Sequence, residues 1–270
     1  MRFPAVAGRF YPSDPDELRR CISYCFTHPL GPGMPGPEGS DRKISGIMVP
    51  HAGYLASGMN AAHAYRRAKE DGLPEAYVII GPDHYGTAGG TVICSDNFLT
   101  PLGECGTDED ICGKLSEYYP DSLQAHRFEH SIEVQIPFIQ FIDPDPAVVP
   151  VIMGRQTPGE ASRLAGILEK ACRGRDVMIV ASTDLSHYIP KEKAEILDAQ
   201  VFKAVMSSDP GKLFDTVREK RITMCGYGPV AVAMEMCGAP EMLLHSDSYD
   251  SLKTDPDSVV GYGSAVFGRK

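Results

Sequence analysis

The chain has 270 residues, of which 43% are hydrophobic and 23% are charged, and its formal net charge is −10. This balance is typical of a folded globular protein and argues against disorder. The negative charge repels polyanions, which makes nucleic acid a poor candidate partner. No apolar stretch approaches the ~18 residues of a membrane span, and the first residues lack the apolar core of a secretory signal. We therefore expect a cytoplasmic protein with no membrane or nucleic-acid partner.

Alternating strand and helix patterns follow one another along the chain. Short β-branched runs predict strands, in chain order, at residues 44–49, 76–80, 91–94, 148–152, 177–181 and 259–267. Apolar residues at helical spacing predict helices at residues 14–26, 57–70, 108–117, 130–141, 159–172, 191–207, 210–219 and 229–237. This alternation predicts an α/β layered sandwich around a central, largely parallel or mixed sheet. We expect one domain over residues 1–270.

Local chemistry indicates where several of these elements begin. Ser13 or Asp14 can cap the first helix, Ser57 can cap the second, and Pro229 suits the first helical position of the last. The stretch 31–40 is rich in Gly and Pro and is typical of a surface loop.

Three of the predicted strands run directly into polar motifs. These are Pro50-His51-Ala52-Gly53-Tyr54, Gly81-Pro82-Asp83-His84 and Ser182-Thr183-Asp184-Leu185-Ser186-His187. Ligands of open α/β sheets bind beyond the carboxyl ends of the strands, so the motifs would share one crevice if the strands are parallel neighbours. The sequence therefore predicts that His51, His84, Asp184 and His187 lie near one another.

Two further segments carry chemistry. Cys225 precedes Gly226 and a predicted helix, and the dipole of this helix would favour the Cys225 thiolate. The other cysteines lack such a setting, and we expect them to be reduced and mostly buried. In Glu129-His130-Ser131-Ile132-Glu133, the i, i+3 spacing places His130 and Glu133 on one helix face, from which either could reach the crevice. The remaining histidines have settings typical of surface or supporting residues: His28, His63, His126 and His245.

Two imidazoles and one thiolate would make three protein ligands for a metal ion. His51, His84 and Cys225 would leave positions open for water, oxygen or substrate, and such a set suits Fe(II), Cu or Zn(II). Asp184 and His187 would then orient the ligands or transfer protons, and His130 is a further candidate for proton transfer.

The five ordered motifs, together with Ala7-Gly8-Arg9-Phe10-Tyr11-Pro12, resemble the Memo family, known in prokaryotes as protein B of the AmmeMemoRadiSam system. The resemblance spans nearly the whole chain. It implies a fold like that of the catalytic subunits of class III extradiol dioxygenases, with a metal site at His51, His84 and Cys225. Those dioxygenases use a carboxylate where this chain has Cys225. The system's name implies an AMMECR1-domain protein and a radical-SAM protein as partners.

Four hypotheses about function remain open at this point. The first is an oxidoreductase or dioxygenase-like enzyme that uses Fe(II), or copper, on an unknown small-molecule substrate. The second is a non-catalytic module that binds metal and partner proteins. The third is a hydrolase in which Zn(II) activates water near Asp184. The fourth is nucleophilic catalysis by Cys225 with His187 as its base.

Overall fold

A ten-stranded mixed sheet forms the centre of the computed structural model, which describes residues 1–270. The sheet order is β4-β5-β6-β2-β7-β1-β10-β8, with β3 paired to β6 and β9 paired to β10. The neighbours β6, β2, β7 and β1 run parallel, whereas β10 is antiparallel to β1. The prediction of an α/β fold around a largely parallel or mixed sheet is therefore confirmed. The strands are β1 (Ile44–Val49), β2 (Ala76–Pro82), β3 (Thr91–Ile93), β4 (Phe98–Thr100), β5 (Gly103–Thr107), β6 (Ala147–Met153), β7 (Val177–Ser182), β8 (His187–Ile189), β9 (Pro240–Asp247) and β10 (Val259–Gly268).

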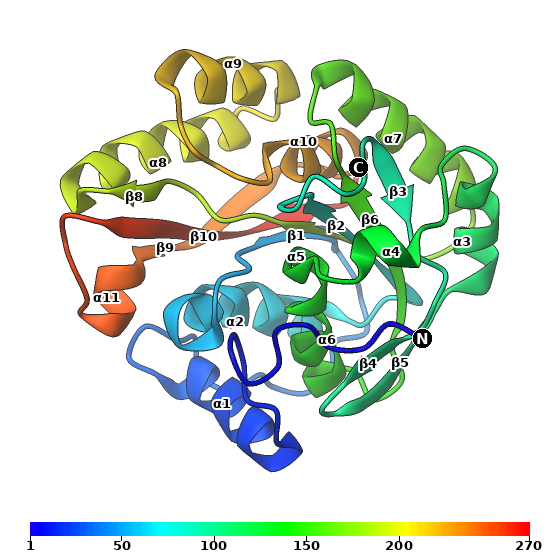
Figure 1. Ribbon diagram of the computed structural model, residues 1–270, viewed down its shortest axis with the longest axis horizontal. Coiled ribbons are helices and arrows are strands. Elements are labelled where there is room, and N and C mark those ends of the chain that lie inside the picture. The colour runs from blue at the N-terminus through cyan, green and yellow to red at the C-terminus, as the bar shows by residue number, and fades with distance from the viewer.

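Helices cover both faces of this sheet (Figure 1). On β2, Tyr77 and Ile79 pack into the core beneath α1, α2 and α6, while Val78 and Ile80 pack into the core beneath α7, α9 and α10. A strand that is covered on both faces has apolar side chains at every position, which is why β2 reads as an unbroken apolar run. The helices are α1 (Pro15–Thr27), α2 (Tyr54–Asp71), α3 (Glu109–Ser116), α4 (Leu123–His126), α5 (His130–Glu133), α6 (Ile136–Ile142), α7 (Pro158–Ala171), α8 (Lys191–Met206), α9 (Pro210–Lys220), α10 (Tyr227–Met236) and α11 (Ser248–Leu252).

Three helix boundaries differ from the prediction. Helix α2 begins at Tyr54 with Gly53 as its N-cap, so Ser57 is not a cap but a buried residue inside the helix. The earlier start is stabilised by the Tyr54 backbone N–H, which donates to the Phe10 carbonyl. The predicted helix 130–141 is divided into α5 and α6, and Pro137 lies in the first turn of α6. Helix α10 begins at Tyr227, two residues before Pro229.

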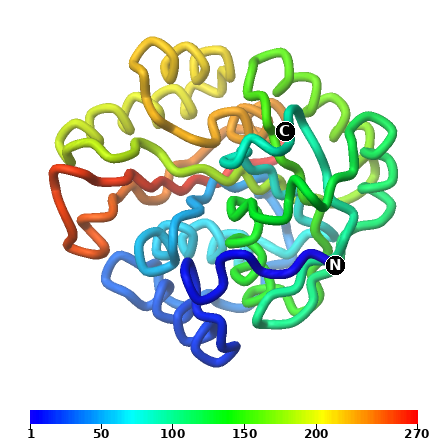
Figure 2. The backbone as a smooth tube through the Cα atoms, in the orientation of Figure 1, coloured from blue at the N-terminus to red at the C-terminus, as the bar shows by residue number.

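The N-terminal segment lies alongside α4 and α5 (Figures 1 and 2). Its Arg2 side chain forms a buried ion pair with Glu133. Glu133 also accepts hydrogen bonds from the backbone of Ala5 and Val6 and from the Tyr11 hydroxyl. This one carboxylate therefore fixes the path of the N-terminal segment across the molecule.

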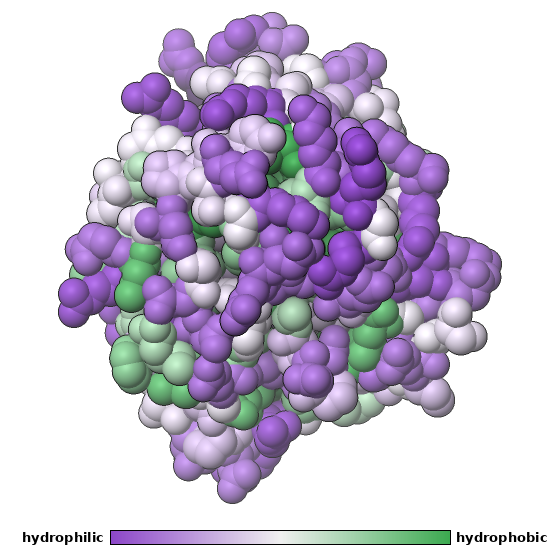
Figure 3. All heavy atoms as spheres, turned by 90° about the vertical axis from the view of Figure 1, so that its right-hand side faces the viewer, coloured by the Kyte–Doolittle hydropathy of each residue, from purple (hydrophilic) through white to green (hydrophobic).

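The face of the molecule seen in Figure 3 is mostly hydrophilic, with small separate hydrophobic areas. No helix combines the length and the apolar composition that a membrane crossing requires.

Candidate metal centre

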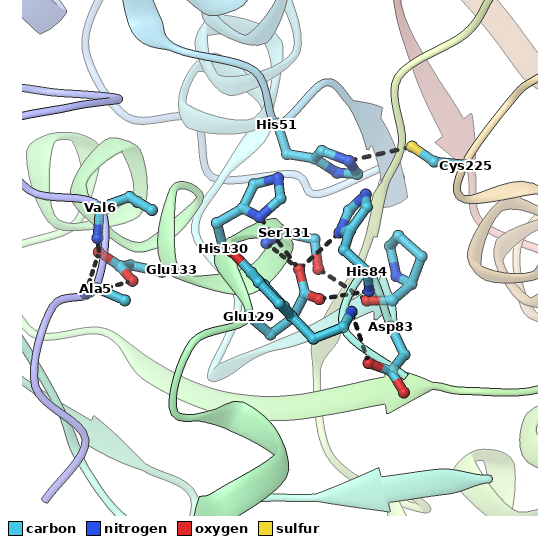
Figure 4. A network of polar contacts seen from close by, with 12 residues as sticks. Ala5, Val6, His51, Asp83, His84, Glu129, His130, Ser131, Glu133 and Cys225 are labelled. Atoms are coloured by element: carbon cyan, nitrogen blue, oxygen red, sulfur yellow. Dashed lines mark hydrogen bonds and ion pairs between the residues drawn. The ribbon is translucent and has the colours of Figure 1, made fainter. Parts of the chain in front are cut away.

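The carboxyl ends of three neighbouring strands meet at the candidate site. Strand β7 lies between β1 and β2 and runs parallel to both. His51 and His84 follow β1 and β2, and Cys225 reaches the same place from the turn before α10 (Figure 4). One ligand atom from each of these three residues lies within 4.8 Å of the other two. The structure thus brings together residues that are far apart in the chain.

His51 is buried and its ring is held in one tautomer. Its Nδ1 lies 2.8 Å from the Ser182 Oγ. The Ser182 hydroxyl donates its proton to the Ser131 carbonyl at 2.6 Å, and it accepts a hydrogen bond from the Gln135 Nε2 at 2.9 Å. Because the hydroxyl proton is already used, the His51 Nδ1 must be the donor in this contact. The Nε2 lone pair is left free and lies 3.1 Å from the Cys225 Sγ.

Glu129 holds His84 in the same way. Its Oε1 lies 2.9 Å from the His84 Nδ1, its Oε2 accepts the His84 backbone N–H at 2.7 Å, and Oε1 also accepts the Ser131 N–H at 2.8 Å. Burial acts against ionisation of Glu129, but these hydrogen bonds and the His84 charge lower its pKa to about 2. An ionised carboxylate can only accept, so the proton of a neutral His84 is on Nδ1 and Nε2 is free. Carboxylate–histidine pairs of this kind are common behind metal ligands.

Cys225 completes the group. Its Sγ accepts the Asp184 backbone N–H at 3.1 Å. Burial, followed by the Asp184 charge, raises the pKa of the Cys225 thiol, and burial lowers the pKa of His51 well below its usual value. Both groups are therefore neutral unless a cation lies between them, and a bound metal ion would favour the thiolate. The next residue must be glycine, because a Cβ at Gly226 would lie 2.3 Å from the Ser182 carbonyl oxygen.

The donor set fits a transition-metal ion. Metal–nitrogen and metal–sulfur bonds of about 2.0–2.3 Å place ligands of one ion about 3–4.5 Å apart. The three ligand atoms lie within 4.8 Å of one another, and the Cys225 Sγ is 3.1 Å from the His51 Nε2. Two neutral imidazole nitrogens and one thiolate are ligands for zinc, copper and iron. Three protein ligands also leave coordination positions open, as in catalytic sites.

His130 lies beside these ligands without joining them in one group. Its ring stacks on His84 with centroids 4.4 Å apart. Its buried Nδ1 makes no hydrogen bond but lies 3.6 Å from the Glu129 Oε1. Burial and the His84 charge lower the pKa of His130 to about 4. His84, Glu129 and His130 form a second possible ligand group, but both Glu129 oxygens already accept N–H donors.

Asp184 and His187 lie on the β7 side of the site and have different contacts. The buried Asp184 carboxylate accepts the His51 backbone N–H at 2.8 Å, and burial raises its pKa. His187 lies at the partly exposed rim, where its Nδ1 is 2.8 Å from the Thr223 carbonyl oxygen. That contact fixes the Nδ1 proton and leaves Nε2 without an intramolecular partner.

Several residues around the site were missed or misjudged from sequence. Glu129 and Gln135 were not singled out, although Glu129 begins a recognised motif and only the fold reveals its contact with His84. Glu133 does not reach the crevice and points toward Ala5 and Val6 instead (Figure 4). His126 is not at the surface: it is 1% exposed, and burial and the Arg2 charge lower its pKa to about 3.

The fold and these contacts define an α/β protein with a candidate His–His–Cys metal centre. A family described as Memo-like protein matches residues 2–266, and this chain belongs to the Memo family. It is 41% identical to a MEMO1 family protein of Methanobrevibacter smithii, covering 99% of both chains, and 40% identical to one of Methanothermobacter thermautotrophicus, covering 97% of this chain and 98% of the relative. An uncharacterized protein from Escherichia coli K12 has the same type of fold, with a TM-score of 0.56, 14% identity, and coverage of 84% of this chain and 100% of that one.

Proposed function

We propose that this chain binds a divalent transition-metal ion through His51, His84 and Cys225 and acts as a metal-dependent oxidoreductase of the dioxygenase-like kind. The observation that supports the proposal is the convergence of one ring nitrogen of His51, one of His84 and the Cys225 Sγ within 4.8 Å of one another. Two imidazoles and one anionic ligand with open positions resemble the two-histidine, one-carboxylate set of non-haem Fe(II) oxygenases. Fe(II) is therefore the first candidate, with copper and Zn(II) as alternatives.

When bound, such an ion would supply open positions for oxygen and substrate together with one-electron chemistry. The chain's own residues would supply orientation and protons. Asp184 would hold the turn that carries His51, since its carboxylate accepts the His51 N–H. His130 would transfer a proton beside the Glu129 carboxylate, whose Oε1 lies 3.6 Å from its Nδ1, and His187 would do so at its free Nε2 on the rim.

Metal analysis of protein purified without oxygen tests this proposal. We expect the wild type to retain iron in a stoichiometric ratio to the protein, and we expect Cys225→Ala to lose most of this iron. Cys21→Ala is the matched control, because Cys21 is a partly exposed cysteine on α1 and should leave the iron content unchanged. Equal iron in Cys225→Ala and in the wild type would refute the ligand assignment.

A second candidate rests on the contact of 3.1 Å between the Cys225 Sγ and the His51 Nε2. This contact would suit a thiol nucleophile whose base is His51. His187 makes its ring contact with Thr223 and no hydrogen bond with Cys225. The pKa directions weaken this candidate, because burial disfavours both the thiolate and the imidazolium. Alkylation of Cys225 at the same rate with and without added metal would favour it over metal binding.

The other two alternatives are distinguished by simple outcomes. Hydrolysis of esters or amides by zinc-loaded protein, abolished in His51→Ala, would indicate a Zn(II) hydrolase. Stable capture of a partner by both the wild type and His51→Ala, with no turnover, would indicate a metal-binding interaction module. The AMMECR1-domain and radical-SAM proteins are the partners that the family association suggests for such a capture.

A further inference from the structure

The turn that carries Cys225 is hydrogen-bonded on one side to the segment that follows β7. The Cys225 backbone N–H donates to the Asp184 carbonyl at 3.3 Å. The Gly226 N–H donates to the Thr183 Oγ1 at 2.9 Å. These two hydrogen bonds use the N–H groups of Cys225 and Gly226, so the Cys225 carbonyl and the residues after Gly226 need partners from another part of the fold.

Gln156, between β6 and α7, holds the other side of this turn. Its Nε2 donates to the Cys225 carbonyl at 2.7 Å, and its Oε1 accepts the Gly228 N–H at 2.7 Å. One planar amide therefore bridges the backbone on both sides of Gly226. The side chain lies flat against the turn, because a Cβ at Gly228 would be 2.9 Å from the Gln156 Cγ.

We propose that Gln156 is a positioning residue that keeps the Cys225 sulfur in ligand geometry, an inference that rests on the proposed metal-binding function. Both the Nε2 and the Oε1 of the amide are needed, since the Cys225 carbonyl requires a donor and the Gly228 N–H requires an acceptor. A shorter side chain cannot span the same two backbone groups from this position. Metal–ligand distances tolerate deviations of about 0.2 Å, so a small rotation of the turn about Gly226 is enough to weaken the metal–sulfur bond.

Titration with Co(II) alone, in the absence of oxygen, measures this effect. We expect the wild type to show a sulfur-to-cobalt charge-transfer band and Gln156→Ala to bind Co(II) about 10-fold or more weakly with a reduced band, as for other residues that orient ligands. Gln156→Glu should also bind weakly, because its carboxylate faces the Cys225 carbonyl without a donor. Gln140→Ala is the matched control, since Gln140 also bonds a backbone carbonyl and a second group, in its case at Gly103 and Thr100.

The alkylation rate of Cys225 in metal-free protein gives a second readout, measured by peptide mass spectrometry. Release of the turn should make this rate several-fold faster in Gln156→Ala than in Gln140→Ala. Gln156→Asn replaces Gln156→Ala if the latter does not fold. Wild-type affinity, an unchanged band and an unchanged alkylation rate in a folded variant would overturn the inference. Absence of the sulfur-to-cobalt band in the wild type would instead overturn the metal-binding function, and the inference with it.

Discussion

Replacing Glu129 by Gln changes the group behind His84 without changing its size. The Glu129 Oε1 accepts two N–H groups and its Oε2 accepts a third. A glutamine whose oxygen takes the Oε1 position places its NH₂ group against the His84 backbone N–H. In the reverse orientation, the NH₂ group faces two donors, the His84 Nδ1–H and the Ser131 N–H. At least one buried donor is left unpaired, and the charge that polarises the imidazole is lost.

We expect Glu129→Gln to weaken metal binding about 10- to 100-fold, the usual effect of losing the partner of a ligating histidine. This corresponds to about 1.4–2.7 kcal/mol of binding free energy. Competition with a chelator of known affinity, in the absence of oxygen, measures the change. Glu117→Gln is the control, because Glu117 is exposed at the end of α3. Affinity within about twofold of wild type would refute the orienting role of Glu129, since the expected loss begins at about 10-fold.

Three further predictions concern stability. Glu133→Ala leaves the Arg2 charge buried without its partner and should lower the free energy of unfolding by about 3–5 kcal/mol. Urea unfolding measures this change, and a decrease in the free energy of unfolding no larger than that of Glu117→Ala would contradict the prediction. Burial lowers the pKa of His126 to about 3, so the unfolded state binds the extra proton below pH ~6.5 and stability falls by up to about 1.4 kcal/mol per pH unit toward pH 3. Between pH 7 and 4.5, the free energy of unfolding should therefore fall more steeply with decreasing pH in the wild type than in His126→Gln. Equal slopes in the two proteins would refute the burial of a neutral His126. Burial raises the pKa most strongly for five of the twelve tyrosines, so stability should fall above pH ~10: Tyr11, Tyr54, Tyr65, Tyr77 and Tyr262. The absorbance change at 295 nm should therefore reach the value for all twelve tyrosines only with unfolding, and full ionisation while the fold persists would be contrary to this expectation.

The sequence was informative where a buried strand leads into a polar motif. The runs that form β1, β2 and β7 were predicted with nearly the right bounds, because strands covered on both faces are continuously apolar. Their parallel adjacency was an assumption that the sheet order confirms. Strand β9 was missed because it pairs only with β10 and is half-exposed, so its sequence lacks a continuous apolar run.

Supporting contacts were beyond reach because they join residues that are distant in the chain. The Arg2–Glu133 ion pair links the N-terminus to α5, and the helical spacing of Glu133 does not indicate Arg2 as its partner. Gln156 follows a strand in an ordinary loop, and only the fold brings its amide to the Cys225 turn. Histidine spacing likewise could not show that His126 is buried behind Arg2.

The most direct test of the proposed His51–His84–Cys225 metal centre is anomalous diffraction from crystals grown without oxygen after iron loading. We expect one strong peak at the iron edge, bonded to the Nε2 atoms of His51 and His84 and to the Cys225 Sγ. The same data from Cys225→Ala crystals should show a much weaker peak. A peak bonded to His84, Glu129 and His130 instead, or no peak near His51 in fully loaded crystals, would contradict the proposed centre.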